Sequence, residues 1–281
     1  MSEVTTLTRD EFPALLREIP DLPHSLYIRG SLPPPEYKLL AVVGSRRMSH
    51  YGKDACEKII AGLRGYPISI VSGLALGVDG CAHRAALNAR LHTIAVPGSG
   101  LNDDVLYPRA HYSLAQDILA SGGALLSEEE PDFHARPESF PKRNRIMAGM
   151  SHAVLVVEAG LQSGTLITAR LAVDYNRDVL TVPGSIFSEN TEGPHLLLTL
   201  GATPIRNADD VLLSLGFEAG DHVEHVYSDD EQRVVEILKE PMPRDELLRT
   251  LSLPVAVGNA LLLRMELNGF IVESQGVIRK K

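Results

Sequence analysis

Short apolar runs alternate with helix-length amphipathic stretches from about residue 39 to residue 215. The runs are rich in Val, Ile and Leu and cover residues 39–43, 68–71, 92–96, 124–127, 153–157 and 178–182. Helices are expected between them, over about 50–63, 79–89, 111–120 and 163–175. Continuous apolar runs indicate strands buried on both faces, and helices that alternate with such strands require a parallel sheet. The pattern therefore predicts an α/β fold, a doubly wound Rossmann-like parallel sheet over residues 39–220.

The flanking segments follow other patterns. Residues 1–38 predict one short N-terminal helix, amphipathic over about 8–18, and a Pro-rich connector, which is too little for a domain. Residues 228–281 predict a winged-helix-like domain. Its three helices are expected over 229–239, from Pro243 onward and over 254–267, and its two-stranded wing over 270–273 and 276–279.

Composition limits the class of protein. The chain has 281 residues, of which 44% are hydrophobic and 22% charged, as in an ordinary globular protein. No apolar run reaches the roughly 20 residues of a membrane span, and the N-terminus lacks the features of a signal peptide. Two cysteines, Cys56 and Cys81, are too few for a disulfide framework or a four-thiolate zinc site. We expect small core cysteines, no metal, no cofactor and a reducing cytoplasm.

The charge is acidic overall and basic in one place. Lys and Arg number 27 against 36 Asp and Glu, a formal net charge of −9. This excludes simple electrostatic coating of nucleic acid but allows a local basic site. The densest basic segment, residues 134–147, carries four cations and Phe140 beside one carboxylate. A ring beside several cations suits single-stranded nucleic acid. The same segment could equally well be the solvent-exposed start of a helix, with Phe140 packed into the core and no role in binding.

Loops of small residues follow four of the predicted strands. They lie at residues 44–47, 72–80, 97–100 and 162–165. Any one of them could simply form a tight turn, but four at the ligand-binding edge of a doubly wound sheet favour an anion or nucleotide pocket. The dinucleotide fingerprint and the P-loop are both missing, which argues against NAD, FAD and P-loop ATP chemistry. Arg46 instead offers a planar cation suited to phosphate.

Several motifs in this order resemble the DprA/Smf family, the bacterial DNA-processing proteins of natural transformation. They are Gly44-Ser45-Arg46, Ser72 to Asp79, Phe140-Pro141-Lys142-Arg143-Asn144-Arg145-Ile146, Ala153 to Ala159, Ser163-Gly164-Thr165 and Val182-Pro183-Gly184-Ser185. The resemblance implies a homodimeric single-stranded DNA binder rather than an enzyme. Such a protein covers incoming strands and loads the RecA recombinase.

The resemblance also implies roles for individual residues. Gly44, Ser45 and Arg46 would meet a phosphate. Lys142, taken to lie in a loop, would hold the adjoining backbone together with Arg143 and Arg145. Phe140 would lie near a base, and Asn144 would add hydrogen bonds. Backbone amides would shape the pocket at Gly73, Gly77, Gly98, Ser163, Gly164 and Thr165. Such phosphate contacts position a strand without reading its sequence.

The sequence departs from the family in two places. It reads Gly193-Pro194-His195-Leu196-Leu197 where members commonly have an Asn in place of His195. Residues 1–38 are also too short for the helical N-terminal domain of many members.

Other interpretations remain open at this point. A hydrolase of the LOG type would use the same glycine loops, but its Pro-Gly-Gly-x-Gly-Thr signature is incomplete here and no carboxylate pair is evident. A nucleotide sensor would bind a mononucleotide and ignore a long strand.

Asp79 is expected to hold its loop, and residues 128–130 are expected to form a solvated loop. Because residues 228–281 carry a net charge of −1 and their third helix has only Arg264 as a cation, protein contact is favoured there over duplex reading.

Overall fold

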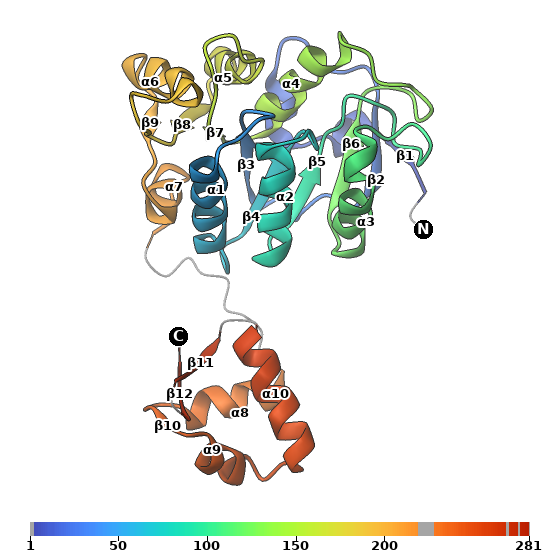
Figure 1. Cartoon of the computed structure of the whole chain (residues 1–281). Helices are drawn as coiled ribbons and strands as arrows, with labels where there is room; N and C mark the ends of the chain where they lie inside the picture. The colour runs from blue at the N-terminus through green and yellow to red at the C-terminus, as the bar shows by residue number, and fades with distance from the viewer. Residues whose placement is uncertain (1–2, 219–227, 268–269, 275, 281) are drawn as a thin grey trace. The chain divides into compact units, whose positions relative to one another are not determined.

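The computed structural model describes residues 3–218, 228–267, 270–274 and 276–280. The chain divides into two compact units, Met1–Val223 and Glu224–Lys281. Figure 1 shows the helices and strands of both units. Each unit has its own buried apolar core.

The large unit is built on a nine-stranded sheet in the order β1-β2-β6-β5-β4-β3-β7-β8-β9. Its strands are β1 (Thr5–Leu7), β2 (Leu26–Gly30), β3 (Lys38–Val43), β4 (Ile68–Ser72), β5 (His92–Ala95), β6 (Ala124–Ser127), β7 (Ala153–Val156), β8 (Asp178–Thr181) and β9 (Thr203–Pro204). The strands from β6 to β9 in this order pair in parallel, which confirms the predicted doubly wound sheet. The strand order reverses between β3 and β7, and ligands of such sheets bind at that point.

Helices cover both faces of this sheet (Figure 1). They are α1 (His50–Gly62), α2 (Val78–Asn88), α3 (Tyr112–Ala120), α4 (Ser139–Met150), α5 (Thr165–Asp174), α6 (Glu192–Thr199) and α7 (Ala208–Ser214). In β3, Leu40 and Val42 pack with α1 and α2, whereas Ala41 and Val43 pack with α4 and α5. Alternate side chains of one strand thus enter two cores, which is why its sequence is apolar throughout. Cys56 and Cys81 are buried in the first core, as expected.

The predicted helix over residues 8–18 is wrong. The chain there forms two short 3-10 helices, Arg9–Glu11 and Ala14–Glu18, on either side of Pro13. Proline lacks the amide hydrogen that a continuous helix needs at this position. Strands β1 and β2 were not foreseen, and they extend the sheet beyond β6 in antiparallel pairing. The N-terminal segment is therefore part of the large unit's sheet.

The basic segment also folds differently from the expectation for Lys142. Lys142 lies in helix α4, not in a loop. Pro141 is the third residue of this helix, where its missing amide hydrogen breaks no intrahelical bond. In the sequence, Pro141 directly before Lys142 argues against a helix, although proline is tolerated in a first turn.

The small unit has the predicted three helices and hairpin. Helices α8 (Asp229–Ile237), α9 (Arg244–Leu251) and α10 (Val255–Leu267) pack with an antiparallel sheet of β10 (Met242–Pro243), β12 (Val277–Lys280) and β11 (Ile271–Ser274). Among the described residues, no single helix is long and apolar enough to cross a membrane. The bent pair α9 and α10 meets that requirement only when both helices are counted together.

Candidate nucleic-acid interface

A cleft of about 1210 Å³ lies beyond the carboxyl ends of β3 and β7. Its walls come from the loop after β3, from α2, from α4, from the loop between β7 and α5, and from the loop after β8. Of the predicted site residues, nine line it: Gly44, Ser45, Arg46, Phe140, Arg143, Asn144, Ser163, Gly164 and Thr165. The structure therefore brings three of the four predicted glycine loops and the buried half of the basic segment around one space.

The loop after β3 is fixed at both sides. The Ser45 backbone amide donates to the Glu158 carbonyl at 2.7 Å, and the Ser45 carbonyl accepts from the Val78 amide at 3.2 Å. The side chains of Arg46 and Arg47 that follow are exposed and line the cleft. A fixed backbone with two exposed guanidinium groups is a suitable arrangement for holding phosphate oxygens.

Phe140 both lines the cleft and packs into the protein. Its ring is half-buried, and the Arg46 guanidinium lies over it, with Cζ 5.1 Å from the ring centroid. The Tyr107 ring is 5.7 Å away, and a Cβ added to Gly98 would come within 2.6 Å of the Phe140 ring. Arg46, Tyr107 and Gly98 thus already occupy much of the ring surface.

Arg143 forms part of the cleft floor. Its side chain is only 6% exposed and donates to the Val96 carbonyl, and a Cβ at Gly73 would overlap its guanidinium. Burial lowers the pKa of Arg143 to about 10, against the opposing effect of Asp79, so the group stays charged at neutral pH. Burial likewise raises the pKa of Asp79, with Arg143 opposing the shift. Arg143 therefore contributes a positive charge to the floor of the cleft. Its guanidinium packs so closely against Gly73 that no larger residue fits there.

Asp79 has the role expected for it. Its Oδ2 accepts from the Gly73 amide at 3.1 Å, which closes the loop between β4 and α2. Gly77, in the same loop, has φ +79°, and a Cβ there would overlap the Ser45 carbonyl oxygen. Gly73, Gly77 and Gly98 are absent from the cleft lining and pack directly behind its walls. Because these glycines have no side chain, neighbouring segments of the chain can pack directly against them.

The N-terminus of α5 opens into the cleft. The Ser163 hydroxyl donates to Thr165 Oγ1 at 2.9 Å and accepts from the Thr165 amide at 3.2 Å. Nothing lies within 4 Å of a Cβ added at Gly164, so the approach to this helix end is open. The amides of the first three residues of α5 donate to Ser163 and Gly164, so the attraction of this end for an anion comes from the helix dipole.

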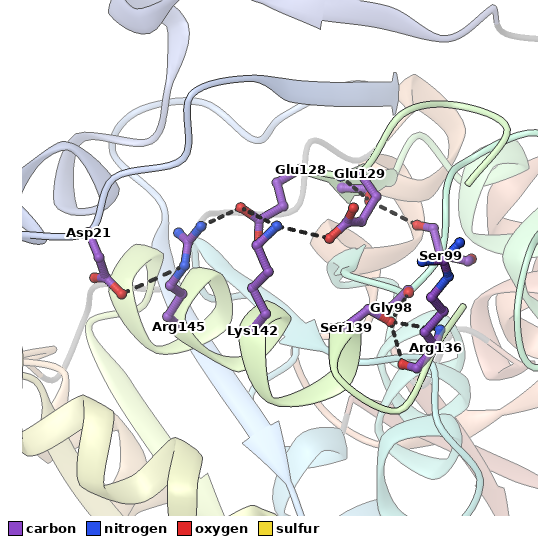
Figure 2. A network of polar contacts seen from close by, with 10 residues as sticks. Asp21, Gly98, Ser99, Glu128, Glu129, Arg136, Ser139, Lys142 and Arg145 are labelled. Atoms are coloured by element: carbon purple, nitrogen blue, oxygen red, sulfur yellow. Dashed lines mark hydrogen bonds and ion pairs between the residues drawn. The ribbon is translucent and has the colours of Figure 1, made fainter. Parts of the chain in front are cut away.

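Lys142 and Arg145 lie outside the cleft lining and are held in a network of ion pairs (Figure 2). Lys142 Nζ is 3.1 Å from Glu129 Oε1 and 3.6 Å from Glu128 Oε2. Arg145 pairs with Glu128 and, at 3.7 Å, with Asp21. The DNA-binding roles of Lys142 and Arg145 remain predictions, and in this structure carboxylates neutralise both cations.

The expectation of a solvated loop at residues 128–130 is wrong for its first two members. The Glu128 side chain is 8% exposed and Glu129 is partly buried, because both follow the buried strand β6 and face α4. Burial raises the pKa of Glu128, and Arg145 and Lys142 oppose this shift.

Five further residues line the cleft: Arg47, Gln162, Phe187, Glu189 and Asn190. Arg47 and Gln162 lie in the predicted pocket loops but were assigned no contact, whereas the segment with the other three was not predicted to lie at the site. Arg47 could have been found, since it follows Arg46 directly. The segment containing Phe187 could not, because long-range bonds fold it over the site: the Asn190 side-chain amide donates to the Arg47 carbonyl at 3.2 Å, and the Ala159 amide donates to the Asn190 carbonyl at 2.7 Å.

His195, the departure from the family pattern, lies in α6. Its Nε2 is 3.1 Å from the Gly184 carbonyl oxygen, and the residue is absent from the cleft lining. It connects α6 to the loop after β8.

The chain is similar to known proteins along most of its length. Residues 3–216 match the family described as DNA recombination-mediator protein A, and residues 224–276 match the DprA winged helix domain. Protein Smf of Escherichia coli is 39% identical over 94% of this chain and 74% of its own length. The solved DNA processing protein A of Streptococcus pneumoniae is 41% identical, with a TM-score of 0.71 over 77% of this chain and 75% of that one.

A further solved relative is DNA processing protein A of Helicobacter pylori, whose structure was described with its single-stranded DNA binding mode. It is 31% identical, with a TM-score of 0.67 over 76% of this chain and 98% of that one. Both units of the chain thus match domains of one family, in the same order. The chain belongs to the DprA/Smf family of DNA-processing proteins.

Proposed function

We propose that the cleft binds single-stranded DNA through its sugar–phosphate backbone, without reading the base sequence. The observation that carries this proposal is the meeting of two exposed guanidinium groups, Arg46 and Arg47, with the N-terminus of α5 in one cleft. Charged donors and the positive end of a helix dipole both favour phosphate oxygens. The binding mode described for the Helicobacter pylori relative supports the same ligand.

The size of the cleft favours a polymer over a mononucleotide. Its volume, about 1210 Å³, exceeds the roughly 300–1000 Å³ of pockets that enclose small ligands. A strand that passes along the cleft can meet Arg46, Arg47 and the α5 N-terminus with successive phosphates.

We further propose that binding involves no hydrolysis. Two buried carboxylates near the cleft already have structural partners. Glu158 accepts from the Ser49 amide at 2.8 Å and from the Ser49 hydroxyl, and so holds the N-cap residue of α1, whereas Asp79 holds Gly73. Glu189 is exposed in the cleft lining, but Asp79, the other carboxylate of the described lining, is buried, so the lining does not present the two exposed carboxylates that could serve as acid and base in hydrolysis.

The biological role that we propose is protection of incoming single strands and their delivery to the RecA recombinase in natural transformation and recombination, in the cytoplasm. The family description as a recombination mediator supports it. Recombinase filament formation on strands covered by a single-strand-binding protein would test it, and an unchanged rate with this protein added would contradict it.

We propose that the working form is a homodimer. Three large apolar side chains near the β9 edge of the sheet, Leu196, Leu200 and Leu213, are exposed. Burial against a second copy would remove them from water. Light scattering would give the mass in solution, and a charged substitution at Leu213 should yield monomers.

For the small unit we propose a protein contact rather than duplex reading. Arg264, the cation of its third helix, lies 3.3 Å from Glu231, and Arg244 pairs with Glu273. These ion pairs reduce the positive charge that the unit could offer to a duplex.

The decisive experiment is a titration against fluorescent oligo-dT at two salt concentrations, with dTMP as competitor. Because each phosphate contact releases counterions, we expect affinity to fall steeply with salt, and dTMP should not compete. Saturable binding or cleavage of a nucleotide without strand binding would instead favour the sensor or the hydrolase.

A further inference from the structure

The loop between β8 and α6 presents an aromatic ring to solvent at the cleft. Phe187 is 93% exposed, the highest value among the large apolar side chains of the described residues, and its neighbour Ile186 is 79% exposed. Phe187 also lines the cleft. A phenylalanine gains its favourable free energy by leaving water, so one held in water on the wall of a binding cleft indicates a ligand surface.

The loop that carries Phe187 is held in place by hydrogen bonds. The Thr191 hydroxyl donates to the Ser185 carbonyl and, at 2.7 Å, to the Ser188 carbonyl. The Phe187 amide donates to Ser185 Oγ at 3.2 Å. The bond from Asn190 to the Arg47 carbonyl joins this loop to the cation-bearing loop after β3. The ring is thus presented at a defined place, beside the proposed phosphate contacts.

The other phenylalanine of the cleft is poorly suited to stack on a base. Phe140 is half-buried, with the Arg46 guanidinium over its ring and Gly98 packed against it. A base could reach that ring only by displacing Arg46, the same side chain that is proposed to hold phosphate. No such competition exists at Phe187, whose ring is exposed to solvent.

We propose that Phe187 is the base-stacking residue of the cleft, and that its ligand is an unpaired nucleobase of a strand whose phosphates meet Arg46, Arg47 and the α5 N-terminus. The proposal rests on the function proposed above. Every nucleobase has a π face, so stacking adds affinity without sequence preference. Bases in a duplex are already stacked on each other, so this contact also favours single strands over duplexes.

The test compares oligo-dT with an abasic strand of the same length. Stacking of one base contributes about 5- to 150-fold in affinity. We expect Phe187→Ala to weaken oligo-dT binding by a factor in this range and to leave the abasic strand unchanged, and Phe187→Trp to restore binding. Val173→Ala is the matched control, since Val173 is also an exposed apolar residue, near the far end of α5, and lies outside the cleft lining.

A second readout reports on stacking directly. A 2-aminopurine base placed in the strand should lose fluorescence on binding to the wild type and less on binding to Phe187→Ala, at saturating protein. The proposal is overturned if Phe187→Ala binds oligo-dT like the wild type, or loses the abasic strand equally. It is also overturned if the variant changes in mass by light scattering, which would assign Phe187 to a protein contact. If the wild type binds neither strand, the proposed function itself fails.

Discussion

The Arg46 guanidinium lies over the ring of Phe140, with its Cζ atom 5.1 Å from the ring centroid. The Phe140 ring also packs closely against Gly98. A cation over an aromatic face is favourable, and here the contact also restricts where an exposed side chain can point. The ring therefore positions Arg46 at the cleft.

Replacing Arg46 with Ala should weaken single-strand binding with little change in stability. One lost charged hydrogen bond to phosphate costs about 1.5–3 kcal/mol, or roughly 10- to 150-fold in affinity. Fluorescence anisotropy with oligo-dT measures the loss. Arg84→Ala, at an exposed position of α2 outside the cleft lining, is the control for net charge, and an equal loss in that variant would remove the site assignment.

Glu129→Gln should strengthen single-strand binding. Lys142 is paired with Glu128 and Glu129, so any phosphate must compete with two carboxylates for it (Figure 2). Exposed ion pairs contribute up to about 1 kcal/mol, so we expect a gain of about twofold to fivefold at low salt. Anisotropy titrations of the single and double variants measure it.

The matched control for this gain is Glu57→Gln, which removes the same charge from an exposed pair with Lys53 on α1. The gain from Glu129→Gln should vanish when Lys142 is also replaced by Ala. If it persists there, Lys142 is not the group that is released.

Gly73→Ala should destabilise the large unit by about 1–3 kcal/mol, because the added Cβ would overlap the buried Arg143 guanidinium. Gly160→Ala is the comparison: its Cβ would make only an ordinary contact, 3.7 Å from the Glu189 carbonyl oxygen, and the change should stay within about 0.5 kcal/mol. Urea unfolding at pH 7 measures both. Similar values for the two variants would contradict the close packing of Arg143 beneath Gly73.

Acid should destabilise the protein through His83. This side chain is fully buried beside Thr93, and burial lowers its pKa to about 3, from about 6.5 when unfolded. Between these values the unfolded chain binds the extra proton, so stability present above pH 6.5 is lost as the pH falls toward 3. From pH 7 to pH 5 the loss from this group is about 2 kcal/mol.

His83→Asn isolates that contribution. Its stability at pH 7 will be lower, but its further loss down to pH 5, measured by urea unfolding, should be smaller than that of the wild type by about 2 kcal/mol. Equal losses in the two proteins would show that His83 already titrates normally in the folded state.

Deletion of residues 228–281 should leave the affinity for oligo-dT within a few-fold. The small unit has its own core and a near-balanced charge, and the cleft lining lies within the large unit. Titration of the shortened chain checks this expectation. A loss of 100-fold or more would mean that the small unit holds DNA.

The sheet could be predicted from the sequence because its strands are continuous apolar runs, of which residues 153–157 are the clearest. Strand β2 could not, since it pairs with β6 across nearly a hundred intervening residues and includes Arg29, which pairs with Asp103 at 2.6 Å. The prediction of a helix over 8–18 was wrong because Pro13, which is plain in the sequence, interrupts it.

The candidate site was predictable only in part, for a similar reason. Arg46 and Ser163 stand at strand ends, where topology alone brings them together. Whether a cation is free depends on distant partners: Lys142 and Arg145 look like Arg143 in the sequence, yet Glu128, Glu129 and Asp21 hold them. Phe187 gives no signal in the sequence, because its exposure follows from how Thr191 and Asn190 fold the loop.

The pairing of β3 with β7 has a consequence for synthesis of the protein. Leu40 pairs with Ala153, and α1, β4, α2, β5, α3, β6 and α4 all lie between these two strands in the chain. A ribosome therefore releases Arg46 long before β7, α5 and the loop after β8 exist to complete the cleft. A nascent or prematurely terminated chain carries the cations without the walls that orient them, so we expect the proposed strand binding to begin only when the whole large unit has been made.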